Sequence, residues 1–95
     1  MMEEFRGLVE RIREQFPSLD VRTDQGNIIR ILTKGGMVGI LREGDEYKAQ
    51  FISFEDDCDF ETTLTKTVAS RDFSAFQEEV LESLGGIPPV RQKSA

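Results

Sequence analysis

The chain has 95 residues, of which 38% are hydrophobic and 32% charged, and its formal charge is −6. A chain of this length closes one hydrophobic core, so we expect a single domain over residues 1–87 and a flexible tail over residues 88–95. The acidic balance repels phosphate backbones and anionic lipids, and no apolar run reaches the roughly 18 residues of a spanning helix, so neither nucleic acid nor a membrane is expected as a partner. The single cysteine cannot form an internal disulfide and indicates the cytoplasm.

An amphipathic helix is predicted from Glu3 to Gln15. Its apolar residues recur at the spacing of one helix face, while charged residues of both signs fill the other face. Pro17 disfavours helical geometry at the residue before it and should end the helix there.

Short runs rich in β-branched residues follow, separated by turn residues. These runs cover residues 19–23, 27–33, 37–42, 46–54 and 59–69. The connections between them are too short for crossover helices, so neighbouring strands should pair antiparallel. The pattern therefore predicts a meander of four to five strands.

The segment "TKGGMVG", from Thr33 to Gly39, lacks the GK[ST] ending of a phosphate-binding loop and leads into a strand-like run. We therefore interpret it as a hairpin turn in which Gly35 and Gly36 supply positive φ angles. Gly39, inside the following strand, should mark a bulge or a close backbone approach.

A second helix is predicted after Asp72, which is a good N-cap residue, and Gly85 is expected at its C′ position. The predicted fold class is α+β: an N-terminal helix, an antiparallel meander and a C-terminal helix in a two-layer sandwich. The residues expected in the core are Phe5, Leu8, Val9, Ile12, Ile29, Ile31, Ile40, Phe51, Leu64, Phe73, Phe76, Val80 and Leu84.

Apolar side chains fall on both faces of the two central strand runs, 27–33 and 37–42. Two helices that pack side by side cover only one face of such a sheet. The second face must be covered by strong sheet curvature, by one helix on each face, or by a second copy of the chain, and closed two-fold dimers are the commonest homo-oligomers. The candidate interface residues are Ile28, Leu32, Met37 and Leu41.

No catalytic residue or cofactor is predicted. The chain has no histidine, which removes the commonest general base and the commonest transition-metal ligand. Cys58 lies between Asp57 and Asp59, whose charges disfavour the thiolate that a nucleophile requires.

The segment from Glu55 to Glu61, both included, contains five carboxylates. Asp57, Asp59 and Glu61 have the spacing of the first, third and fifth ligands of an EF-hand loop. The sixth and twelfth positions, however, are Thr62 and Val68, where that loop needs glycine and glutamate. We expect no tight metal site there and keep weak calcium binding as an alternative function.

These observations favour a small cytoplasmic, non-enzymatic interaction or adaptor module. Its expected partner is a second copy of the chain, as a homodimer, or another protein, through an apolar face of the sheet. No family resemblance is carried by a quotable motif.

Overall fold

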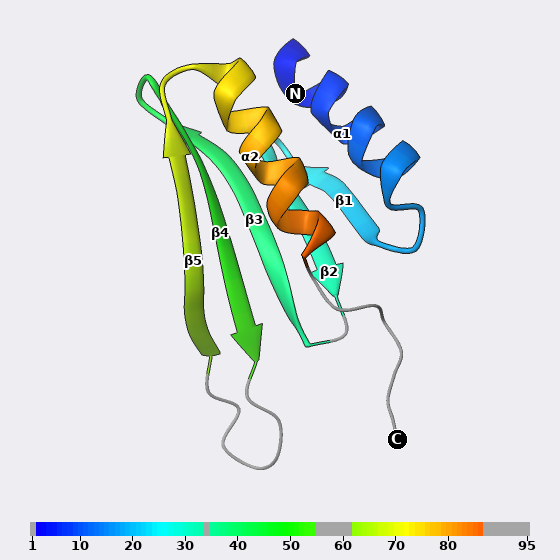
Figure 1. The fold of residues 1–95 in the computed structure, drawn as a ribbon. Coiled ribbons are helices and arrows are strands. Elements are labelled where there is room, and N and C mark those ends of the chain that lie inside the picture. The colour runs from blue at the N-terminus through cyan, green and yellow to red at the C-terminus, as the bar shows by residue number, and fades with distance from the viewer. Residues whose placement is uncertain (1, 34, 55–61, 87–95) are drawn as a thin grey trace.

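The computed structural model describes residues 2–33, 35–54 and 62–86 and gives an α+β fold with the predicted element order (Figure 1). Helix α1 spans Glu3–Gln15 and helix α2 spans Phe73–Gly85. Between them lie β1 (Asp20–Gln25), β2 (Ile28–Thr33), β3 (Gly36–Glu43), β4 (Glu46–Phe54) and β5 (Thr62–Ser70). The predicted fold class is confirmed.

The five strands form one sheet in the order β1-β2-β3-β4-β5, and every neighbouring pair is antiparallel. Two hairpin turns contain glycines with positive φ, Gly26 at 63° and Gly44 at 66°. A left-handed residue without a Cβ gives tight antiparallel turns the twist that the flanking strands need. The antiparallel meander therefore follows from apolar strand segments that are joined by short turns.

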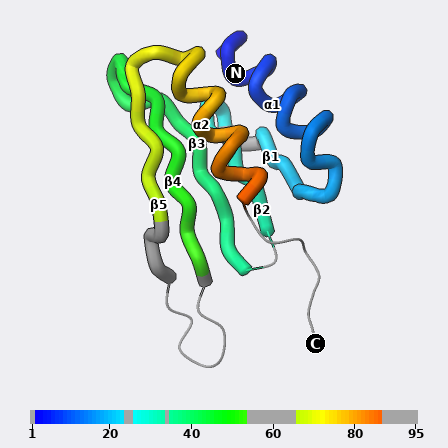
Figure 2. The backbone as a smooth tube through the Cα atoms, in the orientation of Figure 1, coloured from blue at the N-terminus to red at the C-terminus, as the bar shows by residue number. Residues whose placement is uncertain are grey.

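Both helices pack side by side on the same face of the sheet (Figures 1 and 2). The apolar stripe of α1, Phe5, Leu8, Val9 and Ile12, is buried, and α2 buries its own stripe beside it. These side chains form one cluster with Ile29, Ile31, Val38 and Ile40 of the central strands. Of the alternatives for covering the second sheet face, one helix on each face is excluded.

The predicted core is largely confirmed. Every predicted core residue is buried except Phe73, which is partly buried against the core, and Leu64, whose side chain lies outside the described residues. The prediction omitted the buried residues Val21, Val38, Tyr47, Ala49, Val68 and Leu81.

Three local predictions about glycines are wrong. Helix α2 includes Gly85, and its C-cap is Gly86, with φ of −89° instead of a left-handed angle. No positive φ is found at Gly36, where a Cβ atom would instead collide with the backbone of Ile52. The close approach predicted for Gly39 therefore occurs at Gly36, and a Cβ at Gly39 would meet nothing within 4 Å.

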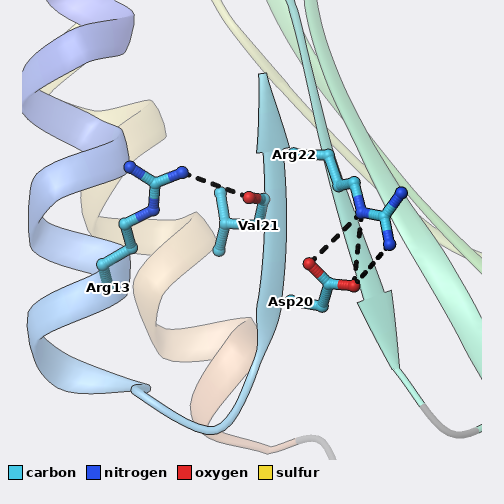
Figure 3. A network of polar contacts seen from close by, with 4 residues as sticks. All are labelled: Arg13, Asp20, Val21 and Arg22. Carbon is cyan, nitrogen blue, oxygen red and sulfur yellow. Dashed lines mark hydrogen bonds and ion pairs between the residues drawn. The ribbon is translucent and has the colours of Figure 1, made fainter. Parts of the chain in front are cut away.

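One carbonyl group of the edge strand β1 is bonded by a side chain of α1. The Arg13 guanidinium donates a hydrogen bond of 3.2 Å to the carbonyl oxygen of Val21 (Figure 3). A register shift between Arg22 and Gln25 also disrupts the β1 ladder. Both features discourage another chain from adding a strand at this edge.

Candidate functional site

The central strands of the sheet are apolar on both faces, as their sequence predicts. Burial alternates along β2 and β3, so that Ile29, Ile31, Val38 and Ile40 are buried under the helices. The residues between them point to the other side, which no described residue covers (Figure 1). We call this side of the sheet the bare face. All four candidate interface residues, Ile28, Leu32, Met37 and Leu41, belong to it.

Aliphatic side chains gather at both ends of the bare face. At one end the register pairs Leu32 with Met37 and Met37 with Ile52, and all three are half-buried. At the other end Ile28 and Leu41 lie next to the Ile29–Ile40 pair, and Ile28 is the most exposed large aliphatic side chain of the described residues, at 37%. Directly paired residues share a sheet face, so each end presents a continuous aliphatic row.

A polar row separates the two aliphatic ends. The register pairs Arg30 with Gly39 and Gly39 with Gln50. Gly39 has no side chain, and a Cβ there would meet nothing within 4 Å. The space above the backbone at the centre of the bare face is therefore open. The sequence prediction omitted Ile52 and Gln50, although the alternation in "EYKAQFISF" places both out of phase with the buried Phe51.

The charges on the bare face balance. Its described bases are Arg22, Arg30 and Lys48, and its described acids are Asp20, Glu43 and Glu46, so its net charge is zero on a chain of −6. Two of the acids are held in ion pairs, Asp20 by Arg22 at 3.0 Å and Glu43 by Lys48 at 2.6 Å. The hydrogen bond with Lys48 lowers the pKa of Glu43, and the same bond raises the pKa of Lys48.

The opposite surface of the molecule is acidic. A groove of about 590 Å³ runs between α1 and α2, and three glutamates of α2, Glu78, Glu79 and Glu82, line it together with Arg11 of α1. Helix α2 contains no lysine or arginine. Part of the excess negative charge of the described residues therefore lies on the outer side of the helical layer, away from the bare face.

A second polar contact between α1 and the sheet is a hydrogen bond between a tyrosine and a carboxylate. The Tyr47 hydroxyl donates to the Glu4 carboxylate at 2.9 Å, and the Arg42 guanidinium lies 5.6 Å from the centre of the Tyr47 ring. The hydrogen bond to Glu4, together with burial, raises the pKa of Tyr47. A tyrosine with a raised pKa is a poor proton donor at neutral pH, so this contact serves packing better than acid–base catalysis.

The Tyr47 ring belongs to an aromatic cluster in the core. Its centroid lies 5.1 Å from that of Phe73, in an edge-on arrangement, and 5.6 Å from that of Phe76. Phe5 of α1 completes the cluster at 6.2 Å from Tyr47. The cluster joins both helices to β4 and accounts for the burial of Tyr47 without a functional role.

The residues that the structure describes contain no group of three His, Cys, Asp or Glu side chains placed to hold a metal ion. The acidic segment Glu55–Glu61, with Cys58, lies outside the described residues, so the weak calcium site stays an untested alternative. Within the same described part, neither helix has the length and apolar composition needed to cross a bilayer.

Comparisons with protein families, with curated proteins and with solved structures find no match to this chain.

Proposed function

We propose that the protein is a small, non-enzymatic interaction module whose working surface is the bare face. The observation that carries this proposal is the pair of aliphatic rows, Leu32–Met37–Ile52 and Ile28–Leu41, on a side of the sheet that no described residue covers. Contiguous exposed aliphatic surface rimmed by polar residues is typical of protein-binding sites.

The hydrophobic effect gives such a face its affinity. Burial of apolar surface contributes about 25 cal/mol per Å². Four of the five side chains are already half-buried and Ile28 is 37% exposed, so covering the remaining exposed part of each stabilises a complex by about 1 kcal/mol. Five such side chains form the apolar centre of an interface, and the polar groups around them add to its specificity.

The composition supports a binding role over catalysis. The chain has no histidine, and the described titratable groups with shifted pKa values, Glu43, Tyr47 and Lys48, are held in structural hydrogen bonds. The proposed setting is the cytoplasm, which a single cysteine without an internal partner supports.

The test is capture of binding proteins by three immobilised forms of the chain, with mass-spectrometric quantification. Leu32→Lys places a charge in the aliphatic row, and Ala75→Lys makes the same charge change on the exposed outer side of α2. The proposal expects specific partners, including any second copy of the chain, to be held by the wild type and Ala75→Lys and lost by Leu32→Lys. Identical capture by all three forms would overturn it.

A further inference from the structure

We propose that the occupant of the bare face is the bare face of a second copy, related by a two-fold axis that runs along β3. This inference depends on the proposed function and adds the identity and orientation of the partner. The resulting dimer has four layers, with the helices of each copy on the outside and the two sheets packed together at the centre.

The charge distribution favours this orientation over any other contact between two copies. Two chains of −6 repel each other, but the bare face has three described bases and three described acids. Face-to-face packing joins the neutral surfaces and places the acidic helical layers on opposite outer sides. These layers are then roughly 30 Å apart at about 10 Å per layer, well beyond the Debye length of about 8 Å at physiological salt.

The polarity of the bare face is self-complementary. Its order along the strands is aliphatic, polar, aliphatic, with Gly39 in the middle of the polar row. A two-fold axis through Gly39 in the plane between the sheets brings aliphatic rows onto aliphatic rows and the polar row onto the polar row. With the axis along β3, four of the five aliphatic side chains meet aliphatic side chains of the second copy. Ile28 lies over Lys48, whose stem is apolar and whose amino group is paired with Glu43.

The polar row selects the direction of the axis. If the axis ran across the strands, Arg30 of each copy would face Arg30 of the other, and the like charges would repel. If the axis runs along β3, the strand β2 of one copy lies over β4 of the second, so Arg30 faces the neutral Gln50 of the second copy. The second direction therefore separates the bases at the centre of the face. It places Glu43 opposite Glu43 of the second copy, but at the end of β3, where Lys48 pairs with each carboxylate.

The face is large enough for a stable dimer. A sheet of five strands whose third strand has eight residues measures about 24 by 27 Å at about 4.8 Å per strand and about 3.4 Å per residue. The projected area of roughly 650 Å² lies within the roughly 600 to 1,000 Å² per partner that stable interfaces bury.

The primary experiment is sedimentation equilibrium of the full chain at 0.15 M salt, with the mass followed from about 1 to 500 µM. The wild type is expected to approach twice the monomer mass. Leu32→Lys should weaken dimerisation by about 100-fold or more, because it buries a charge in an aliphatic row. Ala75→Lys, with the same charge change on the helical layer, should match or slightly strengthen the wild-type association.

A pair of substitutions at Gln50 tests the axis. Gln50→Glu should tighten dimerisation by about tenfold, because the carboxylate faces Arg30 of the second copy, although it makes the chain more acidic. Gln50→Lys should weaken it by about tenfold. The net charge of the chain alone predicts the reverse order, so weaker association of Gln50→Glu than of Gln50→Lys would overturn the proposed axis.

The failures of the two proposals are distinguishable. A wild type that stays monomeric at 500 µM (about fifty times a 10 µM dissociation constant) would overturn the second-copy inference and leave Leu32-dependent capture of other proteins intact. Dimerisation that Leu32→Lys and Ala75→Lys affect equally would also overturn it, because the interface would then lie off the bare face.

Discussion

Gly36 in β3 packs so closely against the carbonyl oxygen of Ile52 in β4 that a Cβ atom at position 36 would overlap this oxygen. The two strands pair here as Gly36 with Ser53 and Met37 with Ile52. On its other side, β4 has a register shift against β5 between Phe51 and Ile52, where Phe51 pairs with Lys66 and Ile52 pairs with Leu64. The close approach therefore occurs beside an irregularity that bends the ladder.

Gly36→Ala is expected to destabilise the protein severely, because the added methyl group collides with backbone that cannot rotate away. We expect a loss of about 3 kcal/mol or more, the upper end of the cost of overpacking, from a total stability of about 5 to 15 kcal/mol. Urea unfolding at low protein concentration measures it. Gly39→Ala, three residues along the same strand and with open space around it, is the control and should change stability by less than about 1 kcal/mol. Equal losses for both variants would contradict this account of Gly36.

Tyr47→Phe removes the hydroxyl that donates to Glu4 and leaves the aromatic cluster in place. We expect a loss of about 1 kcal/mol at neutral pH, the usual net value of one hydrogen bond. A double-mutant cycle with Glu4→Ala should give a coupling energy of similar size, whereas independent losses from the two variants would contradict a direct contact.

The same contact makes a prediction about pH. The hydrogen bond to Glu4 raises the pKa of Tyr47 above the ordinary value of 10.0. The stabilisation is therefore complete below pH 10 and is lost as the pH rises through the higher folded-state value, because the phenolate cannot donate. Measured by urea unfolding, the stability advantage of the wild type over Tyr47→Phe should shrink across this window. A constant difference from pH 8 to pH 11 would show that the hydroxyl does not titrate in this contact.

Much of the fold follows from local sequence signals. The apolar stripe Phe5–Ile12 and the stop at Pro17 predict α1 with its observed bounds. The Asp72 side chain accepts a hydrogen bond of 3.2 Å from the Ser74 amide and caps α2 as expected. These features depend on residues within one or two turns of each other, where periodicity and capping chemistry act.

The features that the sequence did not predict depend on contacts between distant segments. The need for glycine at position 36 comes from Ile52, sixteen residues away on another strand. The core prediction placed Ile29 under the helices and left Ile28 on the other side, as the structure has them, although the two residues are equally apolar and the local pattern alone does not separate them. Four of the five aliphatic residues of the bare face follow from their two-sided pattern, whereas Ile52, like Gln50, is placed on the face by the β3–β4 register.

Arg13→Ala should loosen the edge of the sheet at β1, because it removes the donor to the Val21 carbonyl (Figure 3). We expect a stability loss of about 1 kcal/mol and faster amide hydrogen exchange in the β1–β2 ladder, with little change in β4. Arg11→Ala removes an exposed arginine from the same helix and is the control. If the two variants exchange alike in β1, the hydrogen bond does not protect this edge.

The central claim, that two bare faces meet around Gly39, is tested most directly by intermolecular cross-linking at that residue. In a background with Cys58→Ser, Gly39→Cys places one thiol at the proposed axis, where space is open, and Ala75→Cys places one on the outer side of the helical layer. A bis-maleimide with a reach of about 10 Å, the spacing of packed sheets, is added to each variant at equal concentration. The account predicts efficient formation of a covalent dimer by Gly39→Cys and little by Ala75→Cys. Cross-linking of Gly39→Cys no greater than that of Ala75→Cys, in samples that sediment as dimers, would contradict it.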